Sequence, residues 1–399
     1  MGSSSNLLKV CLSVLVFVST ANAKSQSGIF NVVNFGAVAD GKTDSAKAFL
    51  DAWNQACACD GQGRVVIPRG TFLAGPVSFK GPCKAPIVFQ LTGKVIAPEE
   101  IQSENWITFD YVTGLNISGG GTFDGRGALT WSRTQCYKGG SCGKDPINIR
   151  FNFVTDAAIR GISSVDSKFF HMLVYRCKNV KFFSINISAP ALSHNTDGIH
   201  IGESTGISIT RSFIGTGDDC VSLGPGSENI TVSNVRCGPG HGISIGSLGR
   251  YDDENPLYGI HVKNCTLTGT DNGIRIKTWA VSPTGHSPPG LASDFIFENI
   301  VMDNVANPII IDQEYCPFQY CNKGSPSCVK ISNVSFKDIR GTSKSKLAVK
   351  LLCSKGFPCQ NVELSDINLQ YTGTDGPATS MCTNVDAKIF GNVFPSTCV

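Results

Sequence analysis

The chain has 399 residues, and length alone would allow roughly two or three domains. Its formal net charge is +3 with a sequence pI near 8.1, and its lysines and arginines are scattered, which excludes the basic tract of a nucleic-acid-binding protein. Any preference for an acidic ligand must therefore come from a local site.

The first residues predict export from the cell. Lys9 precedes the apolar run VCLSVLVFV at residues 10–18, and Ala21-Asn22-Ala23 fits a small-residue cleavage site, which is the pattern of a secretory signal peptide. The run is too short to span a bilayer, and no later segment is long and apolar enough. We therefore expect residues 1–23 to be removed and a secreted, soluble chain to begin near Lys24.

Cysteines and sequons agree with this route. The chain has 17 cysteines, of which Cys11 lies in the signal segment, so the mature chain keeps an even number. In an oxidising compartment this predicts that most of them are paired in disulfides. Asn-X-Ser/Thr sequons, the candidate glycosylation sites, occur at Asn116, Asn186, Asn229, Asn264 and Asn333.

Residues 44–57, DSAKAFLDAWNQAC, predict an amphipathic helix with Thr43 as its N-cap. Helical spacing places one apolar face on Ala46, Phe49, Leu50, Trp53 and Cys57. Such a face needs a partner surface, and the repeats that follow supply one.

The rest of the chain repeats a short pattern of polar, small, apolar, any and apolar residues. The pattern occurs as DGIHI from Asp197, DCVSL from Asp219 and HGISI from His241, whose first residues are 22 positions apart each time. The same frame returns in NGIRI from Asn272 and NPIII from Asn307 at longer intervals, which intervening loops explain. Alternating segments such as NVKFFSINIS and NITVSNVRC lie between these repeats.

Short strands with period-2 alternation, frequent Gly and Asn, and a repeat in the twenties predict an all-β chain wound as a right-handed parallel β-helix. We expect one catalytic domain over residues 24–399. The helix at residues 44–57 would cap the open N-terminal end, and disulfide-tied loops around Cys353, Cys359, Cys382 and Cys398 would close the other end. A β-sandwich or propeller is the alternative, because short strands with turn signals also suit those folds.

The repeat gathers four polar groups into one patch. Asp197, Asp219 and His241 occupy equivalent positions on successive coils, and Asp218 adjoins Asp219. Two aspartates after glycine also suit a simple turn, but a shared position on adjacent coils favours a site. Clustered carboxylates repel, so at least one keeps its proton while its partners ionise. Glycoside hydrolysis requires this division, with one acid for the leaving oxygen and a carboxylate for the attacking water.

Two cations end the patch. Alternation in GIRIK buries Ile274 and Ile276, so Arg275 and Lys277 point outward together and would suit a sugar that carries a carboxylate. Asp218, Asp219 and His241 could instead ligate a metal, although no spacing specific to zinc or calcium accompanies them. The remaining histidines are expected to be structural: His171, His194, His200, His261 and His286.

Four motifs in order resemble the signature motifs of the polygalacturonases, glycoside hydrolase family 28: NTDGIH at 195–200, GTGDDC at 215–220, GHGISIGSLGR at 240–250 and RIK at 275–277. The likeness runs from FNVVNFGAVADGKTDSAKAF at residues 30–49 to the cysteine-rich end. Within the family, SIGSLGRYDDENP and NPIIIDQEYCP are most similar to the plant pollen-type exopolygalacturonases.

The resemblance implies a monomeric cell-wall enzyme that needs no cofactor or metal and has no nucleic-acid or membrane partner. It would cleave the α-1,4-galacturonosyl links of polygalacturonate, the pectic polysaccharide, with inversion and from the non-reducing end. It assigns Asp218 as general acid, Asp197 with Asp219 as activators of water, and His241 as support for the protonation state of the acid. It also implies a Cys220–Cys237 disulfide and sugar contacts from Arg275, Lys277, Asn195 and Tyr315.

Three other functions remain open: an endo-acting polygalacturonase, a calcium-dependent pectate lyase on the same kind of fold, and a non-catalytic wall-binding β-helix. Exo action needs a wall beyond the subsite of the terminal sugar. The candidate walls are the loops at residues 131–145, where Cys136 and Cys142 could form a staple, and at residues 249–256 and 280–289.

Overall fold

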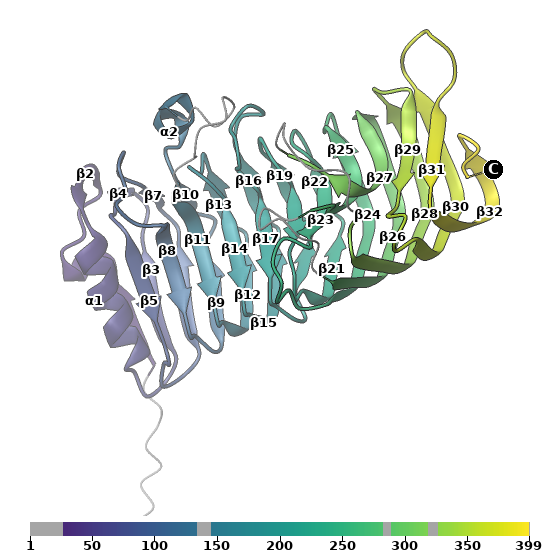
Figure 1. The fold of residues 1–399 in the computed structure, drawn as a ribbon. Helices are drawn as coiled ribbons and strands as arrows, with labels where there is room; N and C mark the ends of the chain where they lie inside the picture. Colours follow the sequence, from purple (N-terminus) through teal and green to yellow (C-terminus); the bar gives the residue numbers. More distant parts are fainter. Residues whose placement is uncertain (1–26, 134–144, 282–288, 318–325, 399) are drawn as a thin grey trace, which may run out of the picture.

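The structure, a computed structural model, describes residues 27–133, 145–281, 289–317 and 326–398. Over these residues the chain winds as a stack of coils, from the N-terminal helix α1 at one end to β32 at the other (Figure 1). Its strands form one sheet of 11 strands, which we call the front sheet, and one of 21 strands, the back sheet. The predicted parallel β-helix is therefore confirmed.

The front sheet consists of β5 (Val77–Lys80), β8 (Asn105–Asp110), β11 (Ile147–Asn152), β14 (Met172–Tyr175), β17 (Ile199–Gly202), β20 (Val221–Leu223), β23 (Ile243–Leu248), β25 (Asn272–Trp279), β27 (Asn307–Tyr315), β29 (Leu347–Leu352) and β31 (Thr379–Thr383).

The back sheet consists of β1 (Gly28–Asn31), β2 (Asp40–Asp44), β3 (Gly63–Ile67), β4 (Thr71–Leu73), β6 (Ile87–Leu91), β7 (Lys94–Ile96), β9 (Leu115–Ser118), β10 (Thr122–Asp124), β12 (Thr155–Arg160), β13 (Ser163–Val165), β15 (Lys178–Phe183), β16 (Asn186–Ser188), β18 (Ser208–Thr210), β19 (Phe213–Gly215), β21 (Glu228–Ser233), β22 (Arg236–Cys237), β24 (Leu257–Thr268), β26 (Gly290–Val305), β28 (Val329–Ser343), β30 (Cys359–Tyr371) and β32 (Val385–Phe394). The 3-10 helix η1 (Val32–Phe35) and the helices α1 (Ala46–Cys57) and α2 (Ala128–Arg133) complete the described elements.

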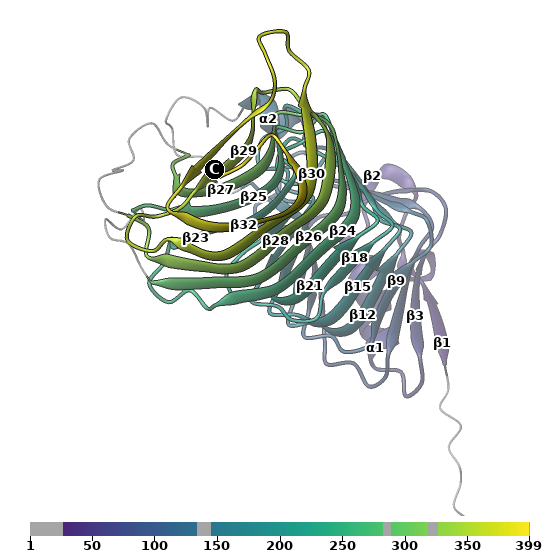
Figure 2. The same cartoon turned by 90° about the vertical axis from the view of Figure 1, so that its right-hand side faces the viewer.

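Parallel pairing in the front sheet follows the sequence repeat. Ile199 pairs with Val221, Val221 with Ile243, Ile243 with Ile274 and Ile274 with Ile309. All five side chains are buried in the interior of the coils. Figure 2 looks along the stack and shows the strands of the two sheets enclosing this interior. The repeat frame in the sequence is thus the coil frame of the structure.

Aromatic rings fill the core of the N-terminal coils. Phe109 stacks on Phe151 at 5.6 Å between ring centroids, and Phe79 lies 5.1 Å from Phe109. Each buried phenylalanine contributes about 1.5–3 kcal/mol relative to an exposed one. The in-register stack therefore supplies much of the stability that holds the coils together.

Helix α1 caps the N-terminal end, with a start and a face that differ from the prediction. The N-cap is Ser45, not Thr43, and Asp44 Oδ1 accepts the Ala46 N–H at 2.9 Å. Phe49 and Trp53 are buried as expected, whereas Leu50 is partly exposed because Ala48, Ala52 and Ala56 pack inward instead. The small alanines let the helix lie close to the coil beneath it.

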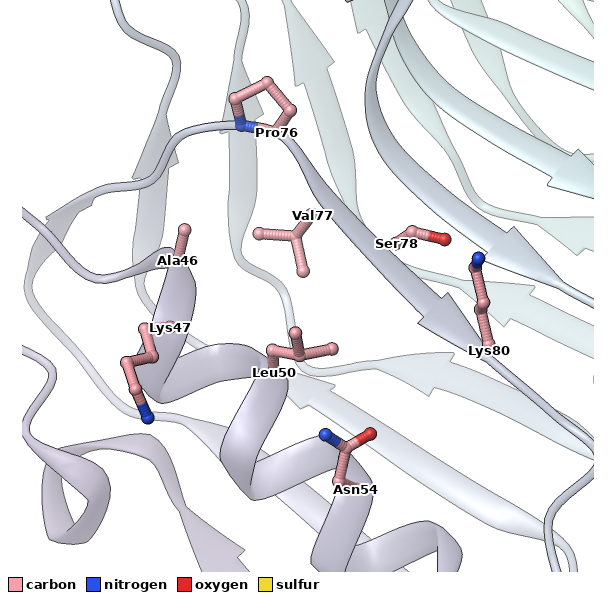
Figure 3. A pocket seen from close by; sticks show the side chains of 8 residues that line it. All are labelled: Ala46, Lys47, Leu50, Asn54, Pro76, Val77, Ser78 and Lys80. Atoms are coloured by element: carbon pink, nitrogen blue, oxygen red, sulfur yellow. The ribbon is translucent and has the colours of Figure 1, made fainter.

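A hollow of about 550 Å³ lies between α1 and β5 (Figure 3). It is lined by Ala46, Lys47, Leu50, Asn54, Pro76, Val77, Ser78 and Lys80. The lining carries no carboxylate or imidazole, so it offers no acid or base for catalysis.

Disulfides stabilise the ends and the middle of the stack. Cys57–Cys83 links α1 to the following coils, and Cys353–Cys359 and Cys382–Cys398 close the C-terminal end as expected. Cys220–Cys237 is the pair that the resemblance implied. Cys177 and Cys265 remain buried thiols, and burial raises the pKa of each to about 11, which makes them unreactive at neutral pH. Cys136 and Cys142 lie outside the described residues.

In the part of the chain that the structure describes, no helix is long and apolar enough to cross a membrane.

The long back-sheet strands β26, β28 and β30 each contain an asparagine or aspartate in the left-handed region. Asp294, Asn333 and Asn361 have φ of 61°, 56° and 52° and stack on successive coils. Asn333 Nδ2 donates to Asp294 Oδ1 at 2.9 Å, and Asn361 Nδ2 donates to Asn333 Oδ1 at 2.9 Å. These residues tolerate positive φ and also bond to their neighbours on adjacent coils.

We predict that Asn333→Ala lowers the free energy of unfolding by about 1–3 kcal/mol, because alanine is strained at this φ and cannot replace the ladder bonds. Asn333→Gly should lose less, since glycine adopts this φ without strain. Both variants remove the sequon, so the comparison is independent of any glycan. Urea unfolding midpoints measure the effect, and equal losses in the two variants would contradict it.

Candidate active site

The front sheet brings the predicted catalytic residues together. Asp197, Asp219 and His241 each lie two residues before the first inward side chain of β17, β20 and β23, so they stand on three successive coils. Backbone bonds continue this register: Gly198 N donates to Asp219 O at 2.9 Å, and Cys220 N donates to Gly242 O at 2.8 Å. Neighbouring coils are about 4.8 Å apart, so the side chains are close neighbours.

The turn before β23 requires its two glycines. Gly240 and Gly242 have φ of 135° and 81°. A Cβ on Gly240 would lie 2.5 Å from Asp218 O, and one on Gly242 would lie 2.1 Å from Asn272 O. The close turn lets His241 N donate to Asp218 O at 2.8 Å, which holds the imidazole beside the aspartate pair.

Asp219 is a buried carboxylate with both oxygens bonded. Oδ1 accepts from Arg275 at 2.8 Å and from Ser244 at 2.6 Å, and Oδ2 accepts from Lys277 Nζ at 2.9 Å. Burial alone would raise its pKa, but the charges of Lys277 and Arg275, with the hydrogen bonds from Lys277 and Ser244, hold it well below the usual range. Asp219 is therefore ionised at any physiological pH.

The surroundings of Asp197 favour its neutral form, in contrast to those of Asp219. Burial raises its pKa well above the usual value, and the charges of Asp218 and Asp219 raise it further. Ser222 Oγ, at 2.6 Å from Oδ2, opposes this shift but does not cancel it. Asp197 and Asp219 thus prefer opposite protonation states, because fixed cations contact Asp219 directly.

Asp218 forms a pair with His241. Its side chain is 21% exposed, and its Oδ1 lies 3.0 Å from His241 Nδ1. Burial would lower the pKa of His241, but the hydrogen bond to Asp218 and the charges of Asp218 and Asp219 raise it overall. Asp218 is thus the most accessible of the three aspartates, with an imidazole of raised pKa next to it.

Predicted sugar contacts flank this cluster. Lys277 Nζ lies 5.5 Å from the ring centroid of Tyr315, and Tyr315 packs edge-on against Trp279. Asn195 lies in the turn before Asp197 with φ of 53°. Arg275 and Lys277 were expected to bind substrate, and the structure adds a second task, because both also neutralise Asp219.

Sequence reasoning missed two serines and underrated two histidines. Ser222 and Ser244 occupy the same outward position as His200 and Arg275 on their coils, so the register could have identified them. His200 Nδ1 lies 2.8 Å from Ser222 Oγ, which links it to Asp197. Burial lowers the pKa of His194, and the charges of Asp218 and His241 also act on it, which places it near the cluster.

Two other histidines have structural contacts. His171 is fully buried and lies 2.9 Å from Ser164 Oγ through Nδ1, and His261 lies 2.8 Å from Glu298 in the back sheet. His286 lies outside the described residues.

A metal ion would compete with existing bonds at this site. Asp218, Asp219 and His241 offer ligand atoms within 4.8 Å of one another. Both oxygens of Asp219 already accept from cations or Ser244, and His241 Nδ1 already faces Asp218. A divalent ion would have to lie against two fixed positive charges, so the residues fit a metal poorly.

Comparison with known proteins places these residues in a family context. Residues 57–391 match the family described as glycosyl hydrolases family 28. An exopolygalacturonase of Platanus acerifolia is 47% identical over 94% of this chain and 98% of its own length. A polygalacturonase of Gossypium barbadense is 49% identical over 96% of this chain and 94% of its own.

Solved structures support the fold. A hyperthermoactive exopolygalacturonase from Thermotoga maritima superposes with a TM-score of 0.73 at 18% identity, over 92% of each chain. An endo-xylogalacturonan hydrolase from Aspergillus tubingensis gives 0.76 at 22% identity, over 90% of this chain and 96% of its own. The shared fold is the right-handed parallel β-helix.

We predict that Lys277→Met lowers the free energy of unfolding at pH 7 by about 1–3 kcal/mol, because Asp219 stays buried with one cation fewer. A depressed pKa stabilises the fold above the unfolded-state pKa, and this contribution is lost as pH falls through the folded-state pKa. Losing Lys277 raises the folded-state pKa of Asp219. On acidification Asp219 therefore takes up a proton, and the cost of its buried charge disappears, at a higher pH in the variant than in wild type. The difference from wild type should therefore narrow toward about pH 4, as urea midpoints would show.

Lys350→Met is the matched control. Lys350 pairs with Asp312 at 3.2 Å in the same sheet, but both side chains are substantially exposed. It should cost about 0–1 kcal/mol. A Lys277→Met difference that does not change with pH would contradict the role of Lys277 in holding Asp219 ionised.

Proposed function

The chain belongs to the glycosyl hydrolases of family 28, and from this premise we propose that it hydrolyses the α-1,4-galacturonosyl links of polygalacturonate. It does so as a secreted, monomeric enzyme of the cell wall, with residues 24–399 as one catalytic domain. The observation that carries the proposal is the cluster of Asp197, Asp218 and Asp219, in which Arg275 and Lys277 keep Asp219 ionised while Asp218 is partly exposed beside His241.

In the proposed mechanism Asp218 protonates the leaving glycosidic oxygen. Its partial exposure gives it access to substrate, and His241 can return a proton to it after turnover. Asp197, with Asp219, orients the attacking water and accepts its proton, so the anomeric configuration is inverted. One turnover moves the proton from Asp218 to Asp197. The preference of the free site for a proton on Asp197 matches the state left after hydrolysis.

The cations supply recognition of the substrate carboxylate. Arg275 uses Nε for Ser244 and one terminal nitrogen for Asp219, which leaves its other terminal nitrogen for a ligand. Lys277 donates one N–H to Asp219, which leaves the other two N–H donors of its ammonium group for a ligand. Asp219 neutralises one of the two positive charges of Arg275 and Lys277, and a bound uronate carboxylate would neutralise the other. Asn195 and Tyr315 line the sugar subsites beside it.

Release of single galacturonate units from the non-reducing end is the proposed mode of action. One candidate wall, the loop at residues 249–256, is held closed by Glu254, whose carboxylate accepts from the backbone of Gly249, Arg250 and Tyr251 at 2.7–3.0 Å. Arg250 lies over the rings of Tyr251 and Trp279, next to the cation pair. Residues 134–144 and 282–288, central to the other two candidate walls, lie outside the described residues.

We predict that Asp218→Asn folds and is secreted but loses about 10²–10⁴-fold in kcat, because an amide cannot donate the proton that the leaving oxygen needs. Asp303→Asn, an exposed change on β26 of the back sheet, serves as the control and should keep full activity. Reducing-sugar release from polygalacturonate measures both. Turnover of Asp218→Asn at the wild-type rate would show that another group is the acid.

We predict that chelators leave the rate unchanged, because Arg275 and Lys277 already supply the positive charge that a metal would bring. The rival, a calcium-dependent lyase, would lose activity with chelator and form an unsaturated, ultraviolet-absorbing product. Reducing-end assays with and without chelator, alongside ultraviolet absorbance, separate the two. A binding protein without catalysis would give neither signal.

A further inference from the structure

The size of the side chains on the outward face of the front sheet changes from one coil to the next beside the proposed catalytic residues. Ile201, Leu223, Ile245 and Ile276 pair in register, and the residue that follows each is Gly202, Gly224, Gly246 and Lys277. On the N-terminal side Gly202 pairs with Tyr175 of β14. Three successive coils therefore carry no side chain at this position, and a tyrosine ends the glycine column on its N-terminal side.

Backbone packing does not explain the whole glycine column. A Cβ on Gly246 would lie 2.2 Å from Lys277 O, so glycine is required there. A Cβ on Gly202 would meet nothing closer than 3.8 Å, in ordinary contact with Tyr175. A side chain as small as alanine would therefore fit at 202, and glycine leaves the Tyr175 ring without a side-chain contact from this position.

The coil of β14 presents bulk across its outward face. Phe170, Leu173 and Tyr175, which we call the end row, occupy the positions that Asp197, His200 and Gly202 occupy on the next coil. The catalytic coil therefore offers short or polar groups where its N-terminal neighbour offers three large side chains.

Cations and rings on neighbouring coils support the end row. The guanidinium carbons of Arg150 and Arg176 lie 5.7 and 5.2 Å from the Tyr175 ring centroid. Phe170 stacks on Phe169 at 4.2 Å and on His200 at 5.0 Å. Cation–π and stacking contacts of this kind hold rings in fixed orientations.

The spacing leaves room for little more than one sugar. Measured along the stack, the end row lies one coil from Asp197 and two coils from Asp219, which is about 5–10 Å at the spacing of parallel strands. Phe170 stands opposite Asp197, and Tyr175 stands further along the strand direction, opposite Gly202. We propose that the end row is the wall of the terminal-galacturonate subsite and that Tyr175 is the specificity-determining residue that limits each cleavage to one unit. This inference rests on the proposed exo action and places its barrier in the strand frame rather than in the loops.

The test is the variant Tyr175→Gly, which removes the tyrosine side chain and extends the glycine column by one coil. Wild-type enzyme should release monogalacturonate from reducing-end-labelled hexagalacturonate. The variant should admit a longer terminal segment, so the early share of digalacturonate should rise at least about tenfold, a change of about 1.4 kcal/mol in relative barrier heights. Product ratios do not depend on how much of the variant folds, because unfolded enzyme releases nothing.

Three further variants make the result specific. Tyr175→Phe keeps the ring and should retain monogalacturonate release. Tyr258→Gly removes an exposed tyrosine from β24 of the back sheet and should leave the products unchanged. Because the Arg150 side chain could occupy the vacated space, the double variant Tyr175→Gly with Arg150→Ala is assayed as well.

The outcomes separate this inference from the proposed function. Wild-type release of monogalacturonate with unchanged products from both Tyr175→Gly variants would overturn the wall and leave exo action intact. A wild-type enzyme that produces a spread of oligomers from the start would instead overturn exo action itself. Digalacturonate from the glycine variants but not from Tyr175→Phe or Tyr258→Gly would support the assignment.

Discussion

In-register parallel pairing of successive coils is the constraint on which the rest of this structure depends. It turns a separation of 22 residues along the chain into a contact between neighbours in space. Because side chains alternate between faces, a slip of one residue would move Ile199, Val221 and Ile243 outward. It would also move Ser222 and Ser244, which hold Asp197 and Asp219, inward. The buried isoleucine ladder and the catalytic patch are therefore two sides of one register, and core packing positions the chemistry.

The charge pattern of the site follows from stacking unlike side chains on adjacent coils. Asp219 alone would resist ionisation when buried, but the register places Arg275 and Lys277 within reach of both its oxygens. For Asp197, burial and the charges of Asp218 and Asp219 outweigh the hydrogen bond from Ser222 and the charge of Lys277, so it favours the neutral form. Rigid coils keep these opposite preferences in place without any rearrangement on substrate binding, which is the preorganisation that electrostatic catalysis relies on.

The sequence allowed the coil frame and the main acidic cluster to be predicted, because both depend on periodicity and on residue types that rarely stack by chance. The start of α1 was missed because Thr43, Asp44 and Ser45 are all good capping residues, and only tertiary contacts select Ser45. Ser222 and Ser244 were missed because a serine in a strand carries no signal until its neighbours are known. The double role of Lys277 was also hidden, since its distance from Asp219 depends on three coils packing together.

The return of a proton to Asp218 connects the electrostatics of Asp197, Asp218 and His241. In the proposed mechanism Asp197 holds the proton taken from water after an inverting turnover and Asp218 has lost its own, so the site must exchange protons before it can act again. Asp197 is buried, whereas Asp218 is partly exposed. Burial would lower the pKa of His241, but the hydrogen bond and charge of Asp218 raise it overall, so the imidazole beside the acid keeps its proton to a higher pH than an ordinary histidine. The rate should thus fall on the basic side as the His241 imidazole loses its proton, although the proposed acid is its neighbour Asp218.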